Sequence, residues 1–201
     1  MVNLKKGQKI SLTKEDAGLR RIMVGLGCDE APQVRHGLRA LFMGKPPDID
    51  CDASAILCGE DGRLVGGKDF CIYFGNLQHP SGAIVHRGDN LTGGGEGDDE
   101  QIMVDLSLLP KEVAKIVFVV NIYDANVRGQ HFGMIRNAFI RLVNNRNGAE
   151  ICRYNLTDDY SGYTGLVVGE IYRSGNEWQF NAVGRGVKEA SRLQKLVELY
   201  K

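Results

Sequence analysis

Ile116-Val117-Phe118-Val119-Val120-Asn121-Ile122-Tyr123 is an apolar run of strand length, rich in β-branched and aromatic residues. Similar short runs, each bounded by turn residues, recur at 53–58, 70–74, 83–85, 138–143, 166–172 and 178–183. Hairpin-type turn signals stand between them, at 60–62, 145–148 and 174–176. This alternation of short runs and tight turns predicts a mostly β fold of antiparallel strands, arranged as a sandwich or barrel.

Helical signal is confined to two stretches. A short helix is expected after Leu109-Pro110, because proline is tolerated in the first turn of a helix. Between 187 and 200 the apolar side chains fall on one stripe, made of Ala190, Leu193, Leu196 or Val197, and Tyr200. The sequence therefore predicts an antiparallel β-sandwich with short helices and an amphipathic C-terminal helix docked on the sheets.

Length and composition favour one domain over residues 1–201 in the cytoplasm. The chain has 25 lysine and arginine residues and 25 aspartate and glutamate residues, so its formal net charge is zero. A chain without net charge has no overall positive field that would attract nucleic acid. The five cysteines lack a C-x-x-C spacing and are expected to be reduced core thiols. Neither a signal peptide nor an apolar run of about 18 residues is present, which predicts a soluble cytoplasmic protein.

The segment 88–100, Gly-Asp-Asn-Leu-Thr-Gly-Gly-Gly-Glu-Gly-Asp-Asp-Glu, carries five acids and no base. Its carboxylates would repel one another in water, and its glycines lose much conformational freedom on folding. A bound cation offsets both costs, and Ca²⁺ takes about six to eight oxygens from carboxylates, amides and backbone carbonyls. Residues 89–100 have the 12-residue length of an EF-hand loop, but Leu91 and Gly93 stand where side-chain ligands are needed, which excludes that motif.

A second acidic set, Asp48, Asp50 and Asp52, projects to one face if this stretch is extended. If the fold brings it beside the glycine-rich segment, the two together can build one or two multidentate sites. The alternative is that both are solvated acidic turns. Mg²⁺ is a further alternative, although so many carboxylates favour Ca²⁺.

Other chemistry has weaker support in the sequence. The four histidines are scattered without metal-ligand spacing, and no serine stands in a nucleophile-elbow context. A metal-dependent phosphoester hydrolase would need a base or a phosphate clamp, for which Arg128 and His131 are the candidates. A Ca²⁺-dependent membrane or anion adaptor would use Leu91 as an apolar tip.

Several motifs together resemble the TerD, or tellurite-resistance, family of bacterial stress proteins, over about residues 2–186. They are 11–14 (SLTK), 24–27 (VGLG), 48–55 (DIDCDASA), 88–93 (GDNLTG), 97–100 (GDDE), 122–125 (IYDA), 128–130 (RGQ), 132–133 (FG), 136–138 (RNA), 169–173 (GEIYR) and Trp178. Two features depart from the family pattern: Glu96 stands where the family often has aspartate, and residues 39–47 look inserted.

The resemblance implies a β-sandwich that binds Ca²⁺ at acidic loops and acts in resistance to chemical stress, with no established enzymatic reaction. Carried over by position, the implied metal ligands are Asp50, Asp52, Asp89, Asn90, Asp98, Asp99 and Glu100, with Glu96 as a further candidate. We therefore expect a calcium-ordered binding or scaffold module that contacts protein partners of a stress-response complex. Peripheral membrane association is the alternative, and no nucleic-acid partner is expected.

Overall fold

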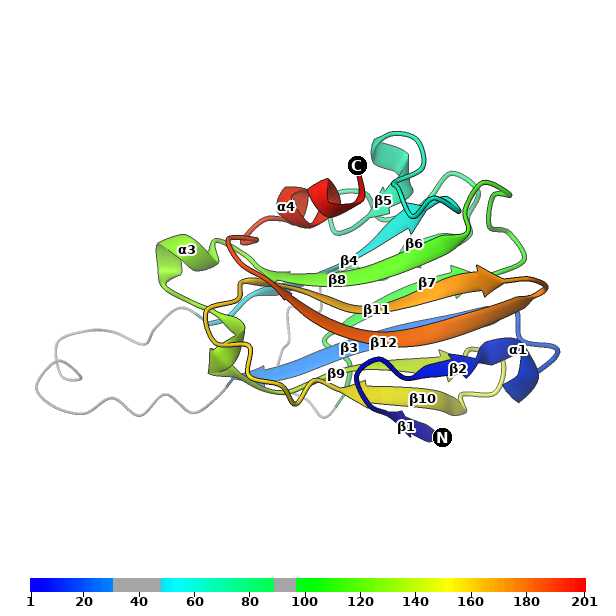
Figure 1. The fold of residues 1–201 in the computed structure, drawn as a ribbon, viewed down its shortest axis with the longest axis horizontal. Coiled ribbons are helices and arrows are strands. Elements are labelled where there is room, and N and C mark those ends of the chain that lie inside the picture. Colours follow the sequence, from blue (N-terminus) through cyan, green and yellow to red (C-terminus); the bar gives the residue numbers. More distant parts are fainter. Residues whose placement is uncertain (31–47, 89–96) are drawn as a thin grey trace, which may run out of the picture.

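The computed structural model describes residues 1–30, 48–88 and 97–201, and within them two six-stranded sheets form a sandwich (Figure 1). The first sheet contains, in spatial order, β1 (Val2–Leu4), β10 (Glu150–Asn155), β9 (Ile135–Asn144), β3 (Arg21–Glu30), β7 (Glu100–Asp105) and β6 (Ile84–His86). The second contains β2 (Lys9–Ser11), β12 (Glu177–Val187), β11 (Gly165–Ser174), β8 (Lys115–Ile122), β4 (Cys51–Cys58) and β5 (Cys71–Ile72). Every pairing between these strands is antiparallel except that of β1 with β10. The predicted antiparallel β-sandwich is confirmed.

Helices in the described residues are single turns: α1 (Leu12–Glu15), η1 (Lys68–Phe70), α3 (Ala125–Arg128), η2 (Phe132–Met134), α4 (Leu193–Val197) and η3 (Glu198–Tyr200). The prediction of a helix after Pro110 is wrong. This segment is a tight turn, in which the Val113 N–H donates a hydrogen bond to the Pro110 carbonyl at 3.0 Å. None of the helices in this part of the chain is long and apolar enough to cross a membrane.

The C-terminal helix exists but is shorter than predicted. Val187 still belongs to β12, and the positive φ of Glu189, 56°, interrupts the chain before α4 begins at Leu193. The predicted apolar stripe is nevertheless confirmed, since Ala190 and Leu196 are fully buried.

Alternation along β4 and β8 explains why both faces of the second sheet are apolar. Ala55 and Leu57 point into the core between the sheets, whereas Ile56 and Cys58 belong to a second cluster with Ala190 and other buried residues. Figure 1 shows α4 lying against this sheet. Strands that are buried on both faces read as near-continuous apolar runs, as β8 does.

Candidate functional site

The two acidic segments meet at one end of the sandwich, where β4 and β7 both begin. Oε2 of Glu100, the first residue of β7, accepts a hydrogen bond from the backbone N–H of Ala53 in β4 at 2.6 Å. The fold therefore brings the beginning of β4 beside the last acid of the segment 88–100. Asp89, Asn90 and Glu96 lie outside the described residues, as do Leu91 and the apparent insertion at 39–47.

Asp98 is held by an arginine from another strand. Its side chain is fully buried, and its two carboxylate oxygens accept hydrogen bonds from Nε and Nη2 of Arg141 at 2.7 and 2.9 Å. Gly25 pairs with Arg141 in the sheet, and a Cβ at Gly25 would collide with the Asp98 carboxylate. The missing side chain at Gly25 thus makes room for this ion pair, whose two-point geometry is the strongest that carboxylates form with arginine.

Asp99 and Glu100 point to other partners. Oδ2 of Asp99 accepts a hydrogen bond from the backbone N–H of Cys28 in β3 at 2.6 Å, and burial raises the pKa of Asp99. Oε2 of Glu100 lies 3.3 Å from Nε2 of His86, in a pair whose side chains are almost wholly buried. Burial opposes a positive charge on His86, but the hydrogen bond and charge of Glu100 outweigh it, so the pKa of His86 is raised.

The three consecutive acids are therefore engaged by four different strands: Asp98 by β9, Asp99 by β3, and Glu100 by β4 and β6. Within residues 1–30, 48–88 and 97–201, no three side chains of His, Cys, Asp or Glu are grouped closely enough to hold a metal ion. The segment 88–100 lacks a base of its own, yet the fold supplies Arg141 and His86 to its last three acids. The sequence reasoning missed both residues, because each lies on a different strand.

A second polar group lies around Asp52, on the outer face of the second sheet. Asp52 and Asn121 are directly opposite on β4 and β8, and Nδ2 of Asn121 donates to Oδ2 of Asp52 at 3.2 Å. Ser54, the next outward residue of β4, completes the group. All three line an open groove of about 250 Å³ whose rim includes Phe74, Tyr123 and Arg192.

Among the described residues, two oxygens in this groove are buried without a hydrogen-bond partner: Oγ of Ser54 and Oδ1 of Asn121. Their residues are only 1% and 2% exposed. Buried polar atoms are nearly always hydrogen-bonded, so this pair indicates a place for a ligand, an ion or ordered water. A signal for Asn121 was available in the sequence, since it is an amide inside an otherwise apolar run.

The two candidates for a phosphoester-cleaving centre have structural roles. Nδ1 of His131 accepts a hydrogen bond from the Gly133 N–H at 3.1 Å and so caps η2. The guanidinium of Arg128 lies over the ring of Tyr123, 5.6 Å from its centroid. Both are compatible with a purely structural function.

Comparisons with known proteins agree with the fold. A family model described as TerD domain matches residues 1–200. The chain is 51% identical over 199 residues to the stress response protein SCP2 of Bacillus subtilis (strain 168). This alignment covers 99% of this chain and 98% of that protein. It is 44% identical over 185 residues to the tellurium resistance protein TerD of Serratia marcescens, which covers 92% and 90% of the two chains.

A solved structure also resembles this chain. It is a homologue of telluride resistance protein (TerD) from Streptomyces coelicolor A3(2), which superposes with a TM-score of 0.61 at 23% identity, over 86% of this chain and 92% of that one. At this identity the likeness concerns the fold alone. The matches over nearly the whole length place this chain in the TerD family, among relatives named for stress response and tellurium resistance.

Proposed function

We propose that this protein is a calcium-ordered binding module of the stress response. In this proposal Asp52, with Asp50 before it and the oxygens of Ser54 and Asn121 beside it, holds a Ca²⁺ ion. The unpartnered buried oxygens of Ser54 and Asn121 are the observation on which the proposal depends.

The donor set around Asp52 fits a hard cation. It offers a carboxylate, an amide oxygen and a hydroxyl, and oxygens of these kinds are the ligands that Ca²⁺ takes. The amide orientation of Asn121 follows from its neighbour: a carboxylate only accepts, so Nδ2 is turned toward Asp52 and leaves Oδ1 for the ion. Backbone carbonyls and water would complete the coordination.

A second ion remains a prediction for Asp89, Asn90, Glu96, Asp98, Asp99 and Glu100. Arg141 and His86 already balance the charge of Asp98 and Glu100. We therefore expect any ion in this segment to depend mainly on Asp99 and on the acids at 89 and 96. One or two ions per chain would agree with the proposal.

Ion binding would order the end of the sandwich where β4 and β7 begin, and so present a surface to a protein partner in a stress-response complex. The unfolded chain cannot assemble the site, so Ca²⁺ adds stability by mass action, about 2.7 kcal/mol at a free concentration 100 times the dissociation constant. We propose a cytoplasmic protein that binds partners and catalyses no reaction.

Calorimetric titration of Ca²⁺ into chelator-treated protein, with a parallel thermal melt, tests the proposal. Binding heat and a higher melting temperature are expected, and Asp52→Asn and Asn121→Ala should each weaken binding about tenfold or more, equivalent to about 1.4 kcal/mol. Asp158→Asn is the matched control, since this carboxylate forms an exposed ion pair with Lys6. Absence of heat and of any melting shift at millimolar Ca²⁺ would defeat the proposal.

The site can be located with a second variant. If Asp52→Asn binds Ca²⁺ as the wild type does while the double variant Asp98→Asn/Asp99→Asn does not, the ion belongs to the glycine-rich segment alone. Turnover of any phosphoester with Mg²⁺, Mn²⁺ or Ca²⁺ would contradict the non-catalytic function, and Ca²⁺-dependent sedimentation with anionic liposomes would favour a membrane adaptor instead.

A further inference from the structure

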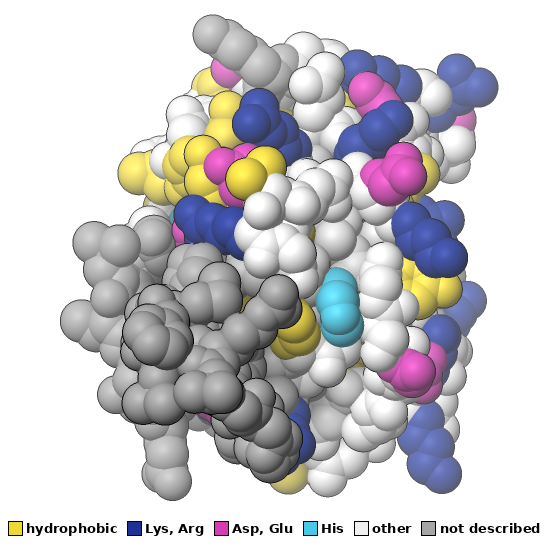
Figure 2. Space-filling model, turned by 90° about the vertical axis from the view of Figure 1, so that its left-hand side faces the viewer, with side chains coloured by type: hydrophobic (Ala, Val, Ile, Leu, Met, Phe, Trp, Pro, Cys, Tyr) yellow, Lys and Arg dark blue, Asp and Glu magenta, His cyan; other side chains and the backbone are white. Residues whose placement is uncertain are grey.

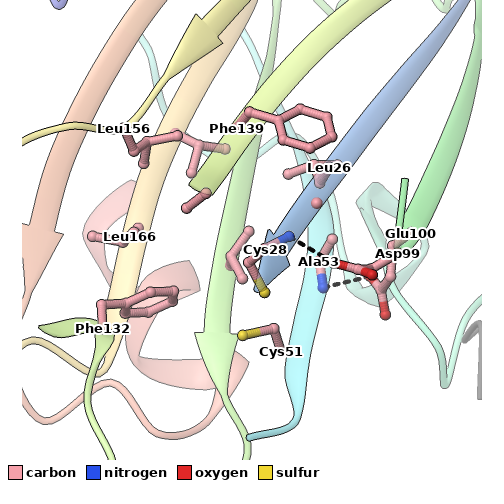
Figure 3. A pocket seen from close by; sticks show the side chains of 14 residues that line it. Leu26, Cys28, Cys51, Ala53, Asp99, Glu100, Phe132, Phe139, Leu156 and Leu166 are labelled. Atoms are coloured by element: carbon pink, nitrogen blue, oxygen red, sulfur yellow. Dashed lines mark hydrogen bonds between the residues drawn. The ribbon is translucent and has the colours of Figure 1, made fainter. Parts of the chain in front are cut away.

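Two cysteines from opposite sheets meet in a small cavity between them. Cys28 lies near the end of β3, and Cys51 is the first residue of β4. Both line a cavity of about 30 Å³ whose other walls are mostly apolar, including Phe132 and Leu166. Figure 3 shows the two sulfurs turned toward one another, and the nearby Cys28 together with burial raises the pKa of the Cys51 thiol.

This arrangement differs from that of the other three cysteines. Cys28 and Cys51 are partly accessible, whereas Cys58, Cys71 and Cys152 are buried. Cys58 and Cys71 lie in the apolar cluster under α4, and Cys152 belongs to the core between the sheets. A small reagent can therefore reach the Cys28–Cys51 pair while the fold protects the remaining thiols.

We propose that Cys28 and Cys51 form a modification site, a dithiol that a low-molecular-weight disulfide oxidises to a bridge between the two sheets. The inference is independent of the calcium proposal. A bridge between facing strands is compatible with a β-sandwich, because such bridges occur in other sandwich domains.

The reaction balances as two thiol–disulfide exchanges. One cysteine, as its thiolate, attacks a sulfur of the reagent disulfide, forms a mixed disulfide and expels one reagent thiolate, which takes up a proton. The second cysteine loses its proton and attacks the sulfur of the first, which expels the second reagent thiol. The protein loses two electrons and two protons, and the reagent disulfide becomes two thiols.

The bridge would hold the end of β3 to the beginning of β4. The Cys28 N–H donates to Asp99, and Cys51 stands between Asp50 and Asp52. The bridge would therefore fix the backbone next to the acids of both segments, Asp99 on one side and Asp50 and Asp52 on the other. It would also close the chain between positions 28 and 51 into a covalent loop. Loop closure restricts the unfolded chain, so the oxidised protein should melt several degrees higher than the reduced protein.

Peptide mapping by mass spectrometry tests the inference on the full-length protein, fully reduced and then incubated under native conditions with oxidised glutathione. We expect a peptide cross-linked between Cys28 and Cys51, a protein mass lower by two hydrogen atoms, and free thiols at the other three cysteines. Cys28→Ser and Cys51→Ser should each abolish the cross-link. The matched control Cys152→Ser, at a buried cysteine, should retain it.

The wild-type map decides the question even if a variant folds poorly. A stable glutathione adduct at Cys28 without a cross-link would overturn the inference, as would complete lack of modification or a bridge between Cys58 and Cys71 in its place. Equal cross-linking of Cys28 to all four other cysteines would also overturn it, because that pattern reports an unfolded chain rather than a built pair.

Discussion

Asp98 shows how a side chain can find its partner far along the chain. Its carboxylate is fully buried against Arg141, 43 residues away, and Arg141 also reaches Glu150 at 3.2 Å. The absence of bases between 88 and 100 predicted a cation as the counter-charge. Local sequence cannot reveal a charge delivered by strand pairing, and for this reason the acids were predicted but Arg141 was not.

Replacement of Arg141 by methionine should be strongly destabilising. The variant leaves the Asp98 carboxylate buried without its ionic partner, a change that typically costs about 3–5 kcal/mol. Urea denaturation at pH 7 would measure the loss. Arg146→Met, at an exposed position, is the control and should change the free energy of unfolding by less than about 0.5 kcal/mol.

Asp105 provides a test by pH. Burial tends to raise its pKa, but hydrogen bonds from Ser107 and from Nε of Arg21, at 2.9 Å, outweigh burial and lower the pKa below 3.8. A lowered native pKa stabilises the fold above the unfolded value, and this contribution is lost as pH falls through the native value.

Asp105→Asn should therefore cost about 1 kcal/mol at pH 7 and progressively less below pH of about 4. Denaturant titrations at several pH values would measure the difference. Glu60→Gln, at an exposed turn, is the control and should change the free energy of unfolding at pH 7 by less than about 0.5 kcal/mol. A cost that stays constant down to pH of about 2 would show that the charge of Asp105 is not what stabilises the fold.

Strands could be predicted where an apolar run of strand length or a cluster of turn residues stands in the sequence itself. The run 116–123 became β8 at 115–122, and the turn signals at 145–148 and 174–176 join β9 to β10 and β11 to β12. The prediction did not include β3, where Gly25 and Gly27 interrupt the apolar alternation. These glycines leave space for Asp98 and Phe139, a packing demand that only the folded sheet reveals.

A bulge in β12 offers a second test. Val183 and Gly184 together face the single residue Val168 of β11, and Gly184 has a positive φ of 60°. A Cβ at Gly184 would collide with the hydroxyl of Tyr154 and crowd that of Tyr160. Both the backbone conformation and the packing therefore favour glycine here.

Gly184→Ala should lower the free energy of unfolding by about 2–4 kcal/mol, of which about 1 kcal/mol reflects the backbone conformation and the rest overpacking. Gly175→Ala is a matched control, because Gly175 also has a positive φ, 58°, but open space around its Cα. Its cost should be only about 1 kcal/mol. Equal melting temperatures for the two variants would contradict the steric argument.

The charge distribution on the surface of the molecule could be predicted from its composition. Equal numbers of basic and acidic residues predicted a surface without one dominant charge, and Figure 2 shows both kinds interspersed on the face in view. The two acidic segments were identified because their residues stand together in the sequence. The groove around Asp52 was not, because the alignment of Asp52 with Asn121 depends on the pairing of β4 with β8.

A single cooperative unfolding transition is expected for the entire chain. One core cluster includes residues from both sheets, and α4 packs on the second sheet through Leu196. The single tryptophan, Trp178, packs against that core, so its fluorescence reports on the sandwich. Its denaturation curve should coincide with that of far-ultraviolet circular dichroism. Separate midpoints would indicate more than one folding unit.

Both sheets end on very short strands. In the described residues, β1, β6 and β2 have three residues each and β5 has two. A long exposed border strand would offer a row of free backbone groups to a neighbouring molecule and would promote polymerisation. This sandwich is thus well suited to accumulate to high concentration without forming fibrils.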